Sequence, residues 1–486
     1  MPDTAELARS RAVADVPAVK MLIGGEWREG AETYDVIDPY RNEVVARAPQ
    51  SSQSDVADAV AAAVEAKARV AAIPPYERAA LLRRVHDMID GRADEIAEIG
   101  TRETGKAVSE MRIEVTRSKD TASLSADEAV KIQGEHMPLD SAPQGAGKIA
   151  MLLRFPVGVV AGITPFNAPF NLALHKIAPS FAAGNAIVLK PPPQAPLTVH
   201  KLVELFVDAG MPPGALNVVY GDEAGPALVA DPRVDFITFT GSNRAGAQIK
   251  AQSGMRRVAL ELGGNGPNIV HADADLDKAA SLCARNAMKN AGQSCISVQT
   301  IYVHEDVLEP FKTKLLELVR AIKVGDPLDP ETEVGTLIDE PTAARVAEWV
   351  AEAVAGGAKV EIGGTREGAL FQPTVLTGVK PEMKVVCEEI FGPVVNLTPY
   401  GSLDDVFATV NKGRFGLHCG IFTKSLDVGF RAIREIRMGG VVIDGPSTWR
   451  IDQMAYGGIK DSGLSREGPR YAIRDMTDER LVIFNL

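Results

Sequence analysis

Residues Gly158–Pro192 read GVVAGITPFNAPFNLALHKIAPSFAAGNAIVLKPP. An apolar strand over residues 158–166 precedes a helix over 171–184, which ends at Gly184, and a second strand that stops at the prolines of 191–193. Strands and helices continue to alternate up to residue 242, and the strands are mostly apolar. Strands that are buried on both faces of a parallel sheet have this composition. The stretch therefore predicts an α/β fold, in which helices cover a parallel sheet.

The rest of the chain surrounds this core with three further kinds of segment. Helical patterns occupy residues 55–68, 77–105 and 108–129, and a second alternating region runs over 258–444. Residues 132–156 are polar and contain Gly and Pro, so we expect an extended hairpin that projects from the domain. About the first 20 residues show no clear period and are expected to form a mobile arm.

Size, charge and cysteine content exclude several classes of protein. A chain of 486 residues suggests two to three domains, at roughly 100 to 200 residues each. The net charge of −12 argues against nucleic-acid or anionic-membrane partners, and no apolar run has a membrane helix's length. The four cysteines form no CxxC pair, the histidines form no ligand-like cluster, and the N-terminus lacks a secretory signal. We therefore expect a cytoplasmic enzyme with reduced thiols and no metal.

Several residues could carry chemistry, but each also has a structural interpretation. Cys295, in NAGQSCISVQ (290–299), is on its own better read as a packed side chain. Glu261 lies in an apolar strand, where it could be a salt-bridged structural acid or a general base with a raised pKa. Asn167 follows a strand, as a helix cap or as an oxyanion donor. Gly241-Ser242 precedes a helix, where it could be a plain helix cap or a site that binds a diphosphate. Lys190 could be a solvated lysine at the end of a strand.

Taken together, seven motifs resemble the aldehyde dehydrogenase superfamily. They occur in the family's order between Ile163 and Gly463, and they are ITPFN, IVLKP, FTGS, LELGG, GQSC, EEIFGPV and YGGIKDSG. The resemblance makes Cys295 the expected nucleophile, while Cys283, Cys387 and Cys419 keep the packing interpretation.

The resemblance also implies an architecture of two Rossmann-type domains and a small β oligomerisation element. The cofactor domain would comprise residues 1–129 and 155–257, and the catalytic domain 258–444. Residues 130–154 and 470–486 would form the oligomerisation element, and 445–469 a return segment to the cofactor domain and active site. A homodimer or homotetramer is expected, because pairing between subunits would cover an exposed strand edge.

The mechanism implied by the resemblance is oxidation of an aldehyde to a carboxylic acid. The Cys295 thiolate would form a thiohemiacetal that loses hydride to NAD(P)+, and water would hydrolyse the resulting thioester. Asn167 and the backbone N–H of Cys295 would hold the oxyanion, and Glu261 would be the general base. Lys176 and Glu467 match positions that relay protons in some members.

For the cofactor, the resemblance assigns Lys190 to the adenosine ribose, Ser242 to the pyrophosphate, and Glu389 and Phe391 to the nicotinamide end. The other expected cofactor-binding residues are Thr164, Pro165, Phe166, Gly221, Gly241 and Leu262. NAD-preferring members often carry Glu three residues after the lysine, where this chain has Pro193. The absent carboxylate would remove repulsion against a 2′-phosphate, so NADP should be at least tolerated alongside NAD.

The expected substrate pocket is small and polar. Its residues would be Arg117, Asn171, His175, Ser294 and Arg450. The two arginines could clamp an anionic aldehyde, or could equally form structural ion pairs. Gly292 and Ser294 are expected to leave room around the sulfur. Two other functions stay open, a CoA-acylating semialdehyde dehydrogenase, disfavoured by Glu261, and a non-catalytic structural relative, disfavoured by the intact site.

Overall fold

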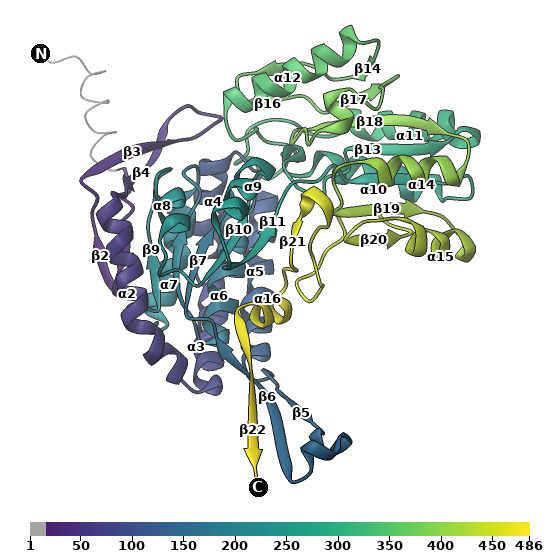
Figure 1. The fold of residues 1–486 in the computed structure, drawn as a ribbon. Coiled ribbons are helices and arrows are strands. Elements are labelled where there is room, and N and C mark those ends of the chain that lie inside the picture. Colours follow the sequence, from purple (N-terminus) through teal and green to yellow (C-terminus); the bar gives the residue numbers. More distant parts are fainter. Residues whose placement is uncertain (1–15) are drawn as a thin grey trace, which may run out of the picture.

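The computed structural model describes residues 16–486 and contains two α/β units with a projecting three-stranded stalk (Figure 1). The predicted N-terminal arm falls largely on residues 1–15, which lie outside the described residues. Within residues 16–486, no helix combines the length and the apolar character that crossing a membrane requires.

The first unit is built on an eight-stranded sheet in the order β2-β1-β9-β8-β7-β10-β11-β21. Its central strands β9, β8, β7, β10 and β11 are parallel, whereas β1, β2 and β21 pair antiparallel at the two edges. The bounds are β1 (Met21–Ile23), β2 (Glu26–Arg28), β7 (Val159–Ile163), β8 (Ala186–Lys190), β9 (Leu216–Val218), β10 (Phe236–Thr240), β11 (Arg257–Glu261) and β21 (Gly463–Leu464). Strands β7, β8 and β9 are buried throughout, which confirms the predicted parallel core.

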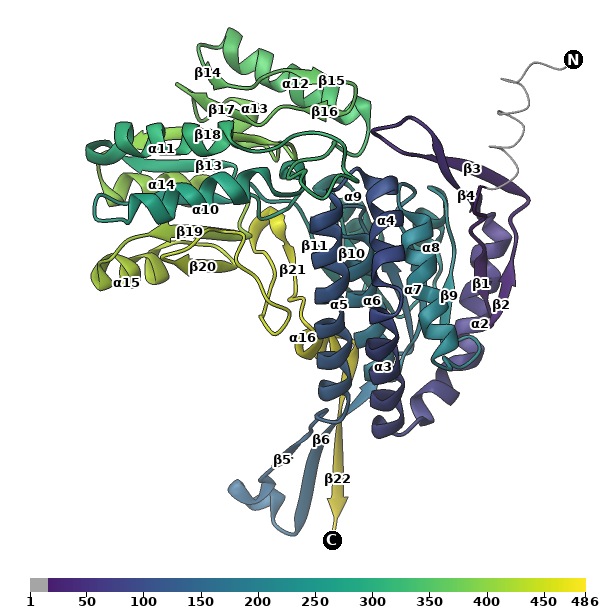
Figure 2. The same cartoon turned by 180° about the vertical axis from the view of Figure 1, so that it is seen from behind.

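Helices cover both faces of this sheet, as the two opposite views show (Figures 1 and 2). They are α2 (Gln53–Ala72), α3 (Pro75–Asp90), α4 (Ala93–Thr104), α5 (Val108–Ala129), α6 (Pro169–Ala183), α7 (Pro196–Asp208), α8 (Ala224–Ala230), α9 (Asn243–Gln252) and α16 (Pro469–Asp475). The predicted stop at Gly184 is confirmed, because its φ of +92° ends α6 in a left-handed cap. The single helix expected over 77–105 is instead two helices, since the backbone leaves helical geometry at Arg92.

The second unit has a seven-stranded sheet in the order β14-β17-β18-β13-β12-β19-β20, parallel except for the β14–β17 pair. Its strands are β12 (Pro267–Val270), β13 (Thr300–His304), β14 (Lys359–Ile362), β17 (Thr374–Thr377), β18 (Val394–Tyr400), β19 (His418–Phe422) and β20 (Gly440–Ile443). Its helices are α10 (Leu276–Met288), α11 (Leu308–Arg320), α12 (Glu340–Ala355), α13 (Lys384–Cys387), α14 (Leu403–Lys412) and α15 (Leu426–Glu435). Two small hairpins complete the fold, β3 (Glu32–Ile37) with β4 (Val44–Gln50), and β15 (Arg366–Glu367) with β16 (Leu370–Phe371).

One predicted boundary between the units is wrong by a strand. The segment from residue 258 was expected to open the catalytic domain, but β11 pairs in parallel with β10 in the first sheet. Helix α9 provides the crossover that brings β11 back beside β10, so β10, α9 and β11 form one βαβ unit. Strand β11 ends at Glu261, and the next strand of the chain, β12, belongs to the second sheet, so Glu261 directly precedes the crossing between the two units.

The stalk joins the predicted hairpin to the C-terminal strand. Strand β22 (Thr477–Asn485) pairs antiparallel with β6 (Lys148–Pro156) over nine residue pairs, and β6 also pairs with β5 (Glu135–Met137). The segment expected to return toward the cofactor domain does so, since Gly463 of β21 pairs with Glu261.

Candidate active site

Cys295 lies in the loop between α10 and β13, directly after a turn of unusual backbone. Asn290 and Ala291 both have a φ of 51°, and the φ of Gly292 is +71°. A Cβ at Gly292 would lie 2.0 Å from the carbonyl oxygen of Gly392. Gly292 therefore permits a close backbone approach to Gly392, a role that the sequence did not indicate. Ser294 is half-buried, and its backbone N–H donates to the carbonyl of Gly292 over 2.9 Å.

Cys295 is half-buried as a residue, and its sulfur lies 2.9 Å from the hydroxyl oxygen of Tyr456. Burial raises the pKa of the Cys295 thiol to about 12, although the hydrogen bond with Tyr456 acts in the opposite direction. Sequence reasoning missed Tyr456, even though this residue opens the YGGIKDSG motif. Cys283 and Cys419 are fully buried, as their packing interpretation predicts, whereas Cys387 is half-exposed.

Asn167 is tied directly to the loop of Cys295. Its side-chain amide donates to the carbonyl oxygen of Gln293 over 3.0 Å. Its own carbonyl accepts from the ammonium of Lys106 at 3.3 Å and from the side-chain amide of Asn290 at 3.0 Å. The helix-cap interpretation of Asn167 is wrong, because Ala168 occupies the N-cap of α6 and makes no side-chain bond. An amide has two N–H donors, so one stays available beside the nucleophile loop.

Glu261 is buried, and neither of its carboxyl oxygens has a hydrogen-bond partner among the described residues. Burial raises the pKa of this carboxyl well above its usual range, and the nearby charge of Glu467 raises it further. Lys176 and Arg450 oppose the shift without forming a contact. The interpretation of Glu261 as a salt-bridged acid is therefore wrong, and the carboxyl is suited to holding and releasing a proton.

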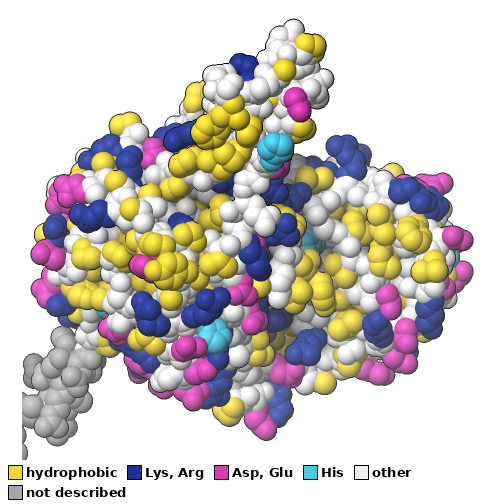
Figure 3. Space-filling view, turned by 90° about the horizontal axis from the view of Figure 1, so that it is seen from below, with side chains coloured by type: hydrophobic (Ala, Val, Ile, Leu, Met, Phe, Trp, Pro, Cys, Tyr) yellow, Lys and Arg dark blue, Asp and Glu magenta, His cyan; other side chains and the backbone are white. Residues whose placement is uncertain are grey.

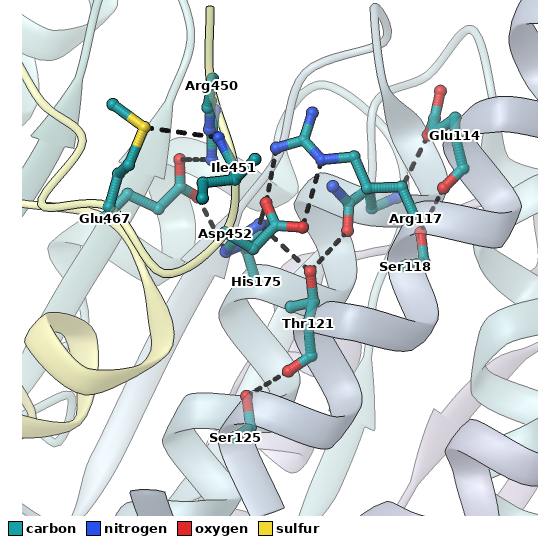
Figure 4. A network of polar contacts seen from close by, with 12 residues as sticks. Glu114, Arg117, Ser118, Thr121, Ser125, His175, Arg450, Ile451, Asp452 and Glu467 are labelled. Carbon is teal, nitrogen blue, oxygen red and sulfur yellow. Dashed lines mark hydrogen bonds and ion pairs between the residues drawn. The ribbon is translucent and has the colours of Figure 1, made fainter. Parts of the chain in front are cut away.

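Glu467 has the opposite electrostatic environment only a short distance away. Its carboxylate lies 3.4 Å from the ammonium of Lys176. It also lies 3.1 Å from the guanidinium of Arg450 (Figure 4). Although burial opposes ionisation, Lys176, His175 and Arg450 lower the pKa of Glu467 to about 2. Burial and charge thus shift the pKa values of Glu261 and Glu467 in opposite directions, as expected for two carboxyls with different roles in proton transfer.

The two arginines predicted to face the substrate have different surroundings. Both oxygens of Asp452 accept from Arg117, at 3.1 Å from Nε and 2.5 Å from Nη2 (Figure 4). The guanidinium of Arg450 lies 3.9 Å from the ring centroid of Tyr456, and its buried Nε has no partner among the described residues. Arg117 is therefore occupied by a structural ion pair, whereas Arg450 keeps one donor free next to the residue that touches the sulfur.

His175 and Asn171 lie in the same network, one turn apart on α6. The Nε2 atom of His175 is 3.2 Å from Asp452, and Asn171 accepts from the hydroxyl of Thr121 at 2.9 Å. Four of the five residues predicted for the substrate pocket thus belong to one polar network, namely Arg117, Asn171, His175 and Arg450. Of these, Arg117, His175 and Asn171 are engaged with protein partners, and Ser294 is not part of the network.

A cavity of about 620 Å³ opens between the two units, beside the end of β11. Of the residues predicted to bind a cofactor, Ser242, Leu262 and Glu389 line it. Ser242 also caps α9, since its hydroxyl accepts from the N–H of Ala245, so its capping interpretation is confirmed. Burial raises the pKa of Glu389 to about 7, and its carboxyl accepts from the N–H of Gly264 at 3.0 Å.

The other predicted cofactor residues do not line this cavity in the described part of the chain. They are Thr164, Pro165, Phe166, Lys190, Gly221, Gly241 and Phe391. Burial lowers the pKa of Lys190 to about 8, so this strand-end lysine is not solvated and would gain from an anionic partner. The rings of Phe166 and Phe391 meet edge to face at 5.9 Å. The helix start and the carboxyl that line this cavity, together with the buried ammonium at the end of β8, fit an extended dinucleotide.

Comparison with known proteins places this geometry in a family. Residues 27–482 match the aldehyde dehydrogenase family model. The chain is 44% identical over 477 residues to a 3-sulfolactaldehyde dehydrogenase of Priestia aryabhattai, covering 98% of this chain and all of the relative.

Two solved structures are also similar over almost their whole length. Aldehyde dehydrogenase 21 from Physcomitrella patens in complex with succinate has a TM-score of 0.95 and 38% identity, covering 97% of this chain and 99% of that one. NADP-dependent glyceraldehyde-3-phosphate dehydrogenase from Bacillus halodurans C-125, complexed with NADP, has a TM-score of 0.94 and 35% identity, with coverage of 96% and 99%.

Proposed function

This chain belongs to the aldehyde dehydrogenase family and is an NAD(P)-dependent aldehyde dehydrogenase; on that premise we propose that its substrate is a short aldehyde with an anionic end group. The observation that carries the proposal is the free, buried Nε of Arg450, whose guanidinium lies over the ring of Tyr456. Because the Tyr456 hydroxyl touches the sulfur of Cys295, this donor lies within a short substrate's length of the nucleophile.

The charge balance around Arg450 favours an anion. Arg117, Lys176 and Arg450 are cationic, while Asp452 and Glu467 are ionised and burial favours the neutral form of Glu261. The cluster therefore has one cation more than it has ionised carboxylates, and a carboxylate, phosphate or sulfonate would balance it. Similar proteins act on or bind such groups, since one is named for 3-sulfolactaldehyde and another holds succinate.

In the proposed reaction the Cys295 thiolate attacks the aldehyde carbon and forms a thiohemiacetal. The free amide N–H of Asn167 and the backbone N–H of Cys295 would donate to its oxyanion, and removal of one such donor typically costs about 3 kcal/mol of barrier. Bound NAD(P)+ supplies the hydride acceptor. Glu261 would first release its own proton through Lys176 and Glu467. Its carboxylate would then accept the proton of the thiol and later that of the hydrolytic water.

Residues around the interdomain space would hold the cofactor. Ser242 at the start of α9 is suited to the pyrophosphate, Lys190 to the adenosine ribose or its 2′-phosphate, and Glu389 with Phe391 to the nicotinamide end. Thr164, Pro165, Phe166, Gly221, Gly241 and Leu262 complete the proposed binding site.

A panel of aldehydes of equal chain length tests the proposal. Sulfonated, carboxylated and neutral aldehydes are oxidised with NAD+ and with NADP+, with and without CoA, while absorbance of the reduced cofactor is followed. We expect the highest kcat/KM for an anionic aldehyde, without a need for CoA. Arg450→Gln should raise KM for the anionic aldehydes alone, and Arg117→Gln should leave the anionic-to-neutral ratio of KM unchanged. Equal losses for neutral and anionic substrates in Arg450→Gln would rule out the anion site.

We further propose that the protein is a cytoplasmic homodimer or homotetramer. The outer strand β22 exposes Leu481, Ile483 and Phe484, and hydrophobic side chains gather on the stalk (Figure 3). An unpaired apolar edge strand is stable in water only when something covers it. Light scattering should show an oligomer for the native chain and a smaller species for Ile483→Lys, whereas a monomeric native chain would disprove the assembly.

A further inference from the structure

Tyr456 makes the only hydrogen bond to the sulfur of Cys295 among residues 16–486. The two atoms are 2.9 Å apart, and the Tyr456 side chain is 2% exposed. The backbone of Tyr456 pairs with that of Glu467 through N–H···O bonds in both directions, at 3.1 and 2.5 Å. The ring position is therefore fixed by the same segment that holds the ionised carboxylate of the site.

The direction of this hydrogen bond follows from the surroundings of the phenol. Burial raises the pKa of Tyr456 well above its usual value, so the hydroxyl keeps its proton. It has no other hydrogen-bond partner among the described residues, and a phenolic O–H is a better donor than a thiol. The sulfur of Cys295 is therefore the acceptor.

Two other groups contact the Tyr456 ring, and both are compatible with a negative charge on the sulfur. The Arg450 guanidinium lies over one face at 3.9 Å, and a cation there withdraws electron density from the ring and strengthens the O–H as a donor. His418 packs edge-on with ring centroids 5.0 Å apart, and burial lowers its pKa to about 4, so it is neutral and does not compete for the thiolate.

We propose that Tyr456 is a further catalytic residue, whose hydroxyl donates a hydrogen bond to the Cys295 thiolate and stabilises the nucleophile. The proton that leaves the sulfur goes to Glu261, while Tyr456 keeps its own proton and changes only the energy of the anion. Without this donor the thiolate would lie in a buried site whose desolvation already disfavours it. The inference rests on the proposed role of Cys295 as the nucleophile.

Tyr456→Phe removes one oxygen atom and tests the donor directly. We measure alkylation of the thiol by iodoacetamide between neutral and mildly alkaline pH, with Cys295→Ala as the background for the other cysteines. A hydrogen bond to a charged group predicts roughly tenfold to hundredfold slower alkylation of Cys295 in Tyr456→Phe, with a parallel fall in kcat/KM. Tyr302→Phe is the matched control, because Tyr302 is another largely buried tyrosine, on β13, and it should alkylate at the native rate.

Three outcomes separate the possibilities. Alkylation of Tyr456→Phe within about twofold of the native rate would overturn the proposal. So would unchanged alkylation with a higher KM for the aldehyde, since the hydroxyl would then bind substrate. Aldehyde oxidation that survives in Cys295→Ala would refute the nucleophile and thus the proposed function instead. If Tyr456→Phe is less stable than Tyr302→Phe, 3-fluorotyrosine at position 456 gives the second test. Because 3-fluorotyrosine retains the hydroxyl, Cys295 in this variant must be alkylated at or above the native rate.

Discussion

The ammonium of Lys106 lies 2.7 Å from the carboxylate of Glu114, and both side chains are more than nine-tenths buried. The other oxygen of Glu114 accepts from the backbone N–H groups of Phe170 and Asn171, at 3.0 and 3.1 Å, in the first turn of α6. Lys106 also donates to the carbonyl of Asn167. The ion pair therefore fastens the segment that carries Asn167 to helix α5.

Lys106→Met should destabilise the protein strongly, because it leaves the Glu114 carboxylate buried without its cation. Breaking a buried pair in this way costs about 3–5 kcal/mol of unfolding free energy. Urea denaturation of native and variant protein measures the loss. Lys323→Met is the control, since its pair with Glu331 is exposed and should contribute little to the unfolding free energy. A similar small change in both variants would contradict the structural role of Lys106.

Gly292→Ala should disrupt the nucleophile loop. Its φ of +71° disfavours any other residue, and the new Cβ would meet the carbonyl oxygen of Gly392 at 2.0 Å. The left-handed strain alone costs about 1–2 kcal/mol, and the collision with backbone adds to it. The Tm of thermal unfolding and the kcat should both be lower in Gly292→Ala than in the native protein. Gly225→Ala is the control, because no atom lies within 4 Å of the position that its new Cβ would occupy. Gly225 lies within α8, so the stability of this variant should be unchanged or slightly higher.

Glu389 should make stability depend on pH in a defined window. Burial raises its pKa to about 7, above the value of an unfolded glutamate near 4.5. As pH rises from about 4.5 to 7, the unfolded chain loses this proton while the folded chain keeps it, so folding becomes less favourable. Glu389→Gln removes this effect. Its stability relative to the native protein should be similar at pH 4.5 and should rise toward pH 7. A difference that is independent of pH would contradict the raised pKa.

Cofactor choice should respond to position 193. With Pro193 instead of a glutamate, kcat/KM for NAD+ should exceed that for NADP+ by less than about a hundredfold, or 2.7 kcal/mol. Pro193→Glu should lower kcat/KM for NADP+ more than for NAD+, because a carboxylate would repel the 2′-phosphate. Steady-state kinetics with both cofactors measure the ratio, and an unchanged ratio in the variant would disprove the explanation.

The local sequence patterns predicted which helices and strands form better than they predicted where each of them begins and ends. The alternation of apolar strands with helices predicted strands β7 to β10, because fully buried parallel strands need continuous apolar side chains. The break at Arg92 and the sheet that β11 joins escaped prediction. The break has a local signal, because Gly91 is the C-cap of α3, whereas the pairing of β11 depends on packing between distant segments.

The sequence by itself determined the α/β class and, through motifs from ITPFN to YGGIKDSG, the family and the set of polar residues at its site. Only the tertiary structure decided what those residues do to one another. It raised the pKa of Glu261 and lowered that of Glu467, paired Arg117 with Asp452 while leaving the Nε of Arg450 without a partner, and brought Tyr456 to the sulfur. The physical reason is that protonation and hydrogen bonding depend on burial and on distances through space, and both arise only when remote segments pack together.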